Sequence, residues 1–198
     1  MDLPELDNIR EFVEIPAMFR SDLTGEPIER CLVCERFLLN DGVQYLIEKA
    51  YKQRRRFHSQ EIIFEYAICL DCHAEMRGSF SEESLVRIDG YFSRRVNLAK
   101  RREELLKSAG MNIEKWVSCC VINGTPVKAM NEYQMLCQCD GMNLLFAYLP
   151  YTLGGAAMDD IMQLLSNKTL DQLDGFIEQY FGLPPEFRET SINRLLFV

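Results

Sequence analysis

The stretch EIIFEYAICLDC, from Glu61 to Cys72, joins a strand-like run to the motif Cys69-x-x-Cys72. Isoleucine, phenylalanine and tyrosine dominate the run, and such side chains are typical of β-strands. A second strand-like run, from Gln44 to Tyr51, precedes it, so the two runs together predict a β-hairpin. The pair Cys31-x-x-Cys34 lies before this hairpin. The predicted order is therefore a C-x-x-C pair, a hairpin and a second C-x-x-C pair.

Two C-x-x-C pairs have the spacing of a structural zinc site. A tight turn within each pair brings its two sulfurs to the separation that tetrahedral ligation requires, with Zn–S bonds of about 2.3 Å. Four thiolates then complete the coordination shell and leave no position for a substrate. We therefore expect Zn²⁺ at Cys31, Cys34, Cys69 and Cys72. Its net negative charge requires basic neighbours, for which the candidates are Arg30, Arg36, Lys49 and Arg77.

The motif Cys69-x-x-Cys72-His73 also has the spacing of a c-type haem attachment site, and Met76 offers a second axial ligand. Haem attachment requires an exported chain and leaves the first cysteine pair without a role, so zinc is the preferred interpretation. Buried cysteines without any ligand are the second interpretation, and haem attachment is the third. Because four thiolates saturate the metal, we expect His73 to be a partly exposed residue on the first turn of a helix.

The order of elements resembles the treble-clef group of zinc modules, including zinc-ribbon-like sites with four cysteines, over residues 28–80. In that group a knuckle and a hairpin are followed by a second C-x-x-C pair that opens into a helix. The resemblance implies a ligand role for the four cysteines. Treble clefs serve DNA binding, RNA binding, protein docking and nuclease chemistry, so the resemblance selects no function.

The chain as a whole is predicted to be an α+β protein in three parts. Residues 1–30 form an acidic lead-in, residues 31–110 hold the zinc module and a long amphipathic helix, and residues 111–198 form a small α+β domain. Apolar residues recur at steps of three and four between Ser81 and Gly110, which predicts a single helix there.

The last part is predicted to contain a small antiparallel β-meander followed by two C-terminal helices. One strand is expected from Trp116 to Ile122 and another from Tyr133 to Cys139. The pair Asp140-Gly141 is a strong signal for a tight hairpin turn after the second strand.

Four further cysteines, Cys119, Cys120, Cys137 and Cys139, are candidates for a second metal site or a redox site. Adjacent residues of a strand point to opposite faces, so Cys119 and Cys120 are poorly placed to share one ion. Cys137 and Cys139 share a face, but positions two apart are separated by about 7 Å, which is wider than tetrahedral ligation accepts. We therefore expect ordinary core cysteines, since a free thiol behaves as a small hydrophobe.

The formal charge of −8 is unevenly distributed along the chain. Residues 31–110 carry fourteen basic and twelve acidic residues, whereas both ends are acidic. Basic residues concentrate in 49–56 and 87–102, and a nucleic-acid surface would use phosphate contacts from these segments. The candidate contacts are Arg54, Arg55, Arg56, Arg87, Arg94 and Arg101. A solvated helix face, balanced by glutamates, is the simpler interpretation.

The sequence contains two histidines and lacks a glycine-rich phosphate loop, a nucleophile elbow and a His-Glu-x-x-His motif. An acidic start and the lack of a long apolar run predict a cytoplasmic protein without a membrane span. The leading hypothesis is a non-catalytic, zinc-stabilised adaptor that binds another protein or a second copy of itself. Nucleic-acid binding is the second hypothesis, and a thiol-dependent or metal-dependent enzyme is the third.

Overall fold

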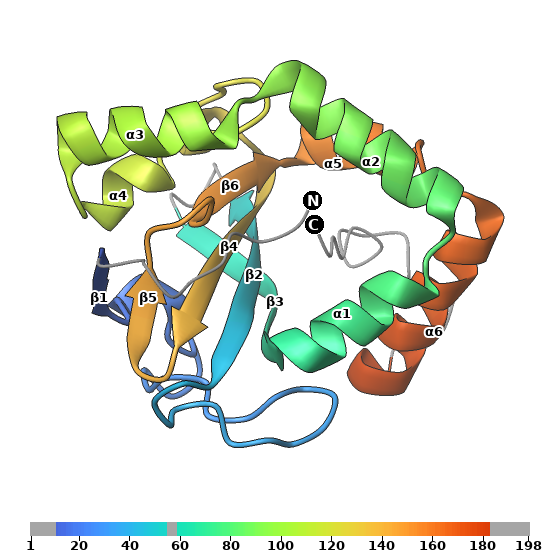
Figure 1. Cartoon of the computed structure of the whole chain (residues 1–198), viewed down its shortest axis with the longest axis horizontal. Helices are drawn as coiled ribbons and strands as arrows, with labels where there is room; N and C mark the ends of the chain where they lie inside the picture. Colours follow the sequence, from blue (N-terminus) through green and yellow to red (C-terminus); the bar gives the residue numbers. More distant parts are fainter. Residues whose placement is uncertain (1–10, 55–58, 183–198) are drawn as a thin grey trace.

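The computed structural model describes residues 11–54 and 59–182 of the 198-residue chain. Its centre is a six-stranded antiparallel sheet (Figure 1) with the strand order β1-β5-β4-β2-β3, in which β6 also pairs with β4. The strands are β1 (Phe12–Glu14), β2 (Gln44–Arg54), β3 (Ser59–Cys69), β4 (Glu132–Asp140), β5 (Asn143–Leu145) and β6 (Tyr151–Gly154). The predicted α+β class and the β2–β3 hairpin are therefore confirmed.

Six α-helices and two short 3₁₀ turns complete the described part of the chain. The helices are α1 (Leu70–Ser79), α2 (Glu82–Arg95), α3 (Leu98–Ala109), α4 (Ile113–Trp116), α5 (Gly155–Met162) and α6 (Asn167–Phe181), and the 3₁₀ turns are η2 (Ala17–Phe19) and η4 (Val127–Ala129). Helices α1, α2, α5 and α6 form an arc along one side of the sheet (Figure 1). The two expected C-terminal helices are confirmed as α5 and α6.

Strand β4 joins the two halves of the chain. It pairs with β2 from Gln44 opposite Asp140 to Lys52 opposite Glu132. Its other edge is shared by β5 and β6, so the expected meander is wrong: the last three strands do not pair in simple succession. The predicted turn after β4 is confirmed at Gly141, whose φ of 52° lies in the left-handed region that glycine tolerates best.

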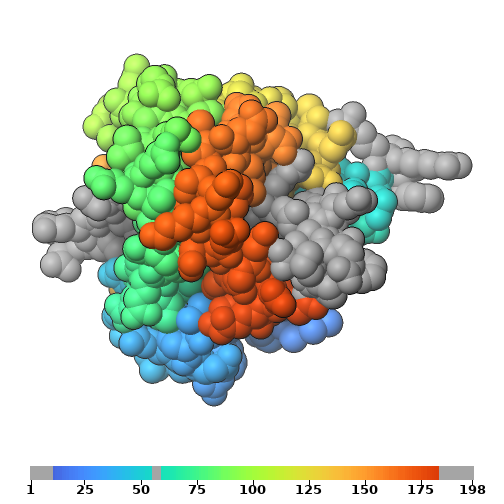
Figure 2. Space-filling view, turned by 90° about the vertical axis from the view of Figure 1, so that its right-hand side faces the viewer, coloured from blue at the N-terminus to red at the C-terminus, as the bar shows by residue number. Residues whose placement is uncertain are grey.

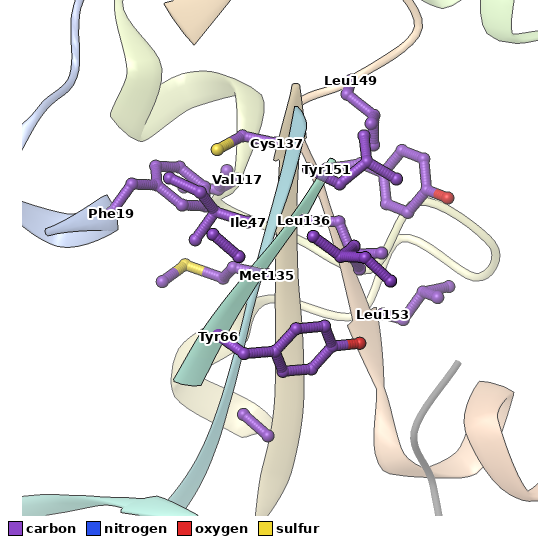
Figure 3. Packing of buried hydrophobic residues seen from close by; sticks show 14 of the residues in the cluster. Phe19, Ile47, Tyr66, Val117, Met135, Leu136, Cys137, Leu149, Tyr151 and Leu153 are labelled. Carbon is purple, nitrogen blue, oxygen red and sulfur yellow. The ribbon is translucent and has the colours of Figure 1, made fainter. Parts of the chain in front are cut away.

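Both faces of the sheet are covered, which explains why β4 is buried along almost its whole length. On the helical face, the ring of Tyr151 lies 6.4 Å from that of Phe92, and the ring of Tyr66 lies 6.5 Å from that of Phe176. Figure 3 shows the opposite face packed against Phe19 and the loop around Val117. The core therefore has two layers, one on each side of the central strands.

A buried lysine fastens the acidic lead-in to the sheet. Lys49 on β2 is fully buried, and its Nζ lies 2.5 Å from Asp22 Oδ1 and 3.0 Å from Glu65 Oε2. Burial lowers the pKa of Lys49, but the hydrogen bond to Asp22, the charge of Tyr51 and the hydrogen bond to Glu65 together raise it above its ordinary value. The amine is therefore charged and paired inside the protein.

The expected single helix from Ser81 to Gly110 is wrong. Val96 interrupts it with an extended backbone (φ −143°, ψ 134°), and α3 begins after Asn97. The side-chain oxygen of Asn97 accepts a hydrogen bond from the amide of Lys100 at 2.9 Å, which caps the second helix. The apolar pattern continues through the break, so periodicity alone does not reveal it.

The expected strand from Trp116 to Ile122 is also wrong. Trp116 closes the short helix α4, and the residues after it form turns. Cys119 and Cys120 take part only in isolated bridges, opposite Pro126 and Thr152 respectively. Trp116 is nevertheless buried, with its indole nitrogen donating to the carbonyl of Gly110 at 2.9 Å.

Candidate metal centre

The first cysteine pair lies in a tight turn. The amide of Cys31 donates to the carbonyl of Arg36 at 2.9 Å, and the amide of Glu35 donates to the carbonyl of Cys31 at 3.0 Å. Glu35 has a φ of 59°, the one non-glycine residue in the left-handed region among residues 11–54 and 59–182. The turn reverses the chain immediately after Cys34, so that both thiols belong to one compact knuckle.

The second pair lies where β3 passes into α1. Cys69 is the last residue of β3 and the N-cap of α1, and Cys72 follows in the first turn of the helix. The amide of Leu32 donates to the carbonyl of Ala67 at 2.8 Å, and the amide of Cys69 lies 3.4 Å from the sulfur of Cys31. The knuckle is thus hydrogen-bonded directly to the end of β3, beside the positive end of the α1 dipole.

These contacts bring four sulfurs together. Those of Cys31, Cys34, Cys69 and Cys72 all lie within 4.8 Å of one another, and those of Cys34 and Cys69 are 3.8 Å apart. Tetrahedral ligation with Zn–S bonds of 2.3 Å places sulfurs about 3.8 Å apart, so the donor set fits a single metal ion. Across the part of the chain that the structure describes, no other group of three or more potential ligands is gathered in this way.

The surroundings of the cluster favour the thiolate at Cys31, whereas burial raises the pKa of Cys69 and of Cys72 above their ordinary values. Burial raises the pKa of Cys31, but the amides of Cys34, Cys69 and Val33 outweigh it, so that the pKa lies below its ordinary value. Cys34 is exposed, whereas the other three cysteines are buried. The site is therefore protected on one side and open to solvent at one sulfur.

Arg36 is the basic residue that the structure places beside the cluster. Its guanidinium lies 2.7 Å from the carboxylate of Asp71, which raises its pKa, and the thiolates of Cys69 and Cys34 raise it further. Arg30 also lies at the knuckle, where its guanidinium donates to the carbonyl of Glu35 at 3.0 Å. The other two candidates are engaged elsewhere: Lys49 with Asp22 and Glu65, and Arg77 with Asp89.

The expectation that His73 is partly exposed is wrong. The residue is buried, and its Nε2 has no hydrogen-bond partner. Burial and the nearby charge of Arg77 lower the pKa of His73 to about 4, so the ring is neutral at physiological pH. It does not belong to the four-sulfur group. Cys69 and Cys72 meet the first cysteine pair, an arrangement that haem attachment does not require.

The other four cysteines are arranged differently. Cys137 and Cys139 are fully buried, and their sulfurs lie 3.8 Å apart, closer than the expected 7 Å because the side chains lean together. Cys120 is buried with its sulfur 3.4 Å from the amide of Gly154, and Cys119 is half-buried. In the described segments they gather no further ligand into a group of three.

Two of the predicted nucleic-acid contacts are exposed but paired with acidic residues. Arg54 lies 2.7 Å from Glu61, and Arg87 lies 2.6 Å from Glu83. Arg55 and Arg56 lie outside the described residues. The paired arginines retain little unbalanced positive charge for a phosphate backbone.

Arg87, Arg94 and Arg101 do not lie on one continuous helix. Arg101 belongs to α3, and its guanidinium turns inward to donate to the carbonyls of Trp116 at 2.6 Å and Pro150 at 3.2 Å. Burial lowers the pKa of Arg101. Arg94, near the end of α2, is exposed. The break between the helices separates residues that a continuous helix would align.

Tyr180 of α6 is a neighbour of the cluster that sequence reasoning missed. Tyr180, Val33 and Cys72 line one groove, so the ring lies beside the site. Burial raises the pKa of its phenol, and the thiolates of Cys72, Cys31 and Cys34 raise it further. Tyr180 is more than 100 residues from Cys72 in the chain, and no local motif marks their proximity.

Comparisons with known protein families, with curated proteins and with solved structures find no match to this chain. None of the described helices has the length and apolar character needed to cross a membrane. The functional argument therefore depends on the geometry of the site.

Proposed function

We propose that this protein is a non-catalytic, zinc-stabilised module that binds another protein. The observation that carries the proposal is the approach of four cysteine sulfurs to within 4.8 Å of one another. Thiolate ligands favour Zn²⁺, and four of them make a closed tetrahedral site of the structural type. A catalytic zinc site keeps one position open for water or substrate, which this ligand set does not provide.

The metal would act as a staple between distant parts of the chain. It would link the knuckle of Cys31 and Cys34 to the junction of β3 and α1, across 34 intervening residues. The order of knuckle, hairpin and helix supports a treble-clef-like arrangement. Because ligands come together only in the folded state, zinc-binding free energy becomes folding free energy, on the order of 10 kcal/mol.

A binding role is the function that remains when the zinc is structural. A structural metal stabilises a surface without taking part in chemistry, and the described arginines contribute few unpaired charges to a phosphate-binding surface. A protein partner is therefore preferred to a nucleic acid. The acidic net charge of −8 favours the same choice.

Two measurements test the proposal. Elemental analysis of the purified full chain should give one zinc ion per chain, and removal of that zinc by a chelator should unfold the protein. Affinity capture with the full chain, with and without nuclease, should retain the same protein partner in both cases. Absence of zinc, or a partner lost on nuclease treatment, would overturn the metal or the protein-binding part respectively.

A further inference from the structure

A groove of about 440 Å³ lies between α1 and α6, immediately beside the four-cysteine cluster. Figure 2 shows α1 in green and α6 in red next to each other on this face of the molecule. The half-buried side chains of Val33, Met76, Phe176 and Tyr180 form its apolar part, and Cys72 reaches it from the cluster. The groove therefore joins the knuckle, α1 and α6, which are the segments nearest to the proposed zinc.

The charge of the groove is negative. Glu75 and Asp171 are the charged side chains in its lining apart from Cys72, both are exposed, and neither forms an ion pair with a described residue. The last turn of α6, which includes Tyr180, adds the negative end of a helix dipole. Zinc with four thiolates would add a net charge of about −2 next to them. No described basic side chain lines the groove to offset this charge.

A glycine keeps the groove open. Gly175 lies within α6, is exposed, and lines the groove. A Cβ added there would meet no atom within 4 Å, and its φ is outside the region reserved for glycine. Alanine is more stable than glycine in an exposed helix interior, so the fold does not need a glycine at this position. Without a side chain, this position leaves open space over the helix.

We propose that this groove binds a segment of a partner protein in which lysine or arginine side chains flank one or two apolar side chains. The inference rests on the proposed protein-binding function and names the surface and chemistry of the partner. Glu75 and Asp171 pair with the basic side chains, while Met76, Phe176 and Tyr180 receive the apolar ones. The same carboxylates repel a phosphate backbone, which distinguishes the groove from a nucleic-acid site.

The probe is a phage-displayed library of twelve-residue peptides, panned on the zinc-loaded full chain. Selected peptides are then synthesised with a fluorescein label, and their affinities are measured by anisotropy. We expect peptides rich in lysine or arginine next to apolar residues, and tighter binding at low salt. The variant Gly175→Trp fills the groove, and the double variant Glu75→Gln/Asp171→Asn removes its charge; each should weaken binding by about tenfold or more.

The matched control is Gly78→Trp. Gly78 is exposed on α1, a Cβ added there meets no atom within 4 Å, and the residue does not line the groove. This variant should bind the peptides as the unmodified chain does. Zinc content and circular dichroism of each variant establish that the fold is retained before the affinities are compared.

Several outcomes would overturn the groove assignment. They are a library that yields no peptide, peptides that are predominantly acidic, and peptides that bind Gly175→Trp as well as the unmodified chain. A labelled single-stranded oligonucleotide whose binding is lost only in Gly175→Trp would also do so. A captured protein partner that still binds Gly175→Trp would refute the groove as the binding site and leave the proposed protein-binding function standing. A folded chain without zinc would instead refute the structural role of zinc.

Discussion

The two groups of cysteines differ in the backbone that carries them. Cys31 and Cys34 lie in a turn, and Cys69 and Cys72 lie where β3 passes into α1, so each pair lies where the backbone conformation changes. Cys137 and Cys139 lie inside the central strand β4, where neighbouring strands fill the space on both sides.

The comparison shows that proximity of two thiols is not enough for a metal site. The sulfurs of Cys34 and Cys69 are 3.8 Å apart, and so are those of Cys137 and Cys139. Only the sulfurs of Cys34 and Cys69 are joined by two further sulfurs, because two separate chain segments meet there. The second pair is surrounded by the core, in which a thiol serves as a small apolar side chain.

The largest expected effect is the loss of unfolding free energy when a cysteine of the four-cysteine cluster is replaced. Cys72→Ala removes one ligand, and we expect loss of zinc together with a loss of unfolding free energy on the order of 10 kcal/mol, which is comparable to the whole stability of a domain. The variant should be insoluble or unfolded. Elemental analysis and thermal unfolding followed by circular dichroism measure both quantities.

Cys120→Ala is the matched control for that substitution, because Cys120 is buried but belongs to no ligand group in the described segments. It should keep one zinc ion per chain and unfold cooperatively. A soluble Cys72→Ala protein that unfolds cooperatively without zinc would contradict the structural role of the metal.

Chemical reactivity should divide the cysteines by exposure. In the native, zinc-loaded protein at pH 8, we expect iodoacetamide to label Cys119 first, because it is the one cysteine outside the proposed zinc site that is not buried. Burial raises the pKa of Cys137 well above its ordinary value, and the neighbouring Cys139 raises it further, so that almost none of the reactive thiolate is present. Peptide mapping by mass spectrometry at matched times measures the order. Labelling of Cys137 as fast as Cys119 would show that the second group is accessible.

A smaller effect is expected from a polar substitution in the second group. Cys137→Ser places a hydroxyl in a fully buried site, and we expect a loss of about 1–3 kcal/mol in unfolding free energy, from desolvation of the hydroxyl. The zinc content should remain one ion per chain. Denaturant unfolding and elemental analysis check the two parts, and a drop from two zinc ions to one would instead place a second metal at Cys137.

The members of the four-cysteine cluster could be predicted from the sequence because C-x-x-C spacing is a local property of the backbone. Cys31 and Cys34 are brought together by one turn, and Cys69 and Cys72 by one helix start, whatever the rest of the fold does. The hairpin between the pairs was likewise predicted from local strand propensity. Local patterns thus sufficed for the first group.

The features that the sequence did not predict are those that tertiary packing determines. The inward turn of Arg101 depends on the break before Asn97, which shifts the phase of α3 relative to α2. The 3.8 Å approach of Cys137 to Cys139 depends on side-chain rotamers rather than strand spacing. The position of Tyr180 beside the cluster depends on how α6 packs against α1. None of these contacts corresponds to a hydrophobic periodicity or to a motif of fixed spacing in the sequence.

The smallest expected effect is the change in zinc affinity when the positive charge beside the four-cysteine cluster is removed. Arg36 is half exposed, pairs with Asp71 at 2.7 Å, and lies where the thiolates of Cys69 and Cys34 raise its pKa. Its positive charge therefore lowers the energy of the thiolate form that binds metal. Residues that support metal ligands in this way typically change metal affinity by about 10–100-fold, and solvent exposure places Arg36 at the lower end. We expect Arg36→Ala to raise the zinc dissociation constant about tenfold without unfolding the protein, as measured by competition with a chromophoric chelator.

Arg54→Ala is the control for this charge effect, since Arg54 is equally exposed and paired, but with Glu61 at the far end of the hairpin. It should leave the zinc dissociation constant unchanged. The difference between the two variants should shrink as salt is added, because the charge of an exposed guanidinium is screened. Equal zinc affinities for Arg36→Ala and Arg54→Ala at low salt would mean that the backbone amides, and not Arg36, provide the compensation. The contrast between the cysteine groups would then depend on backbone geometry alone.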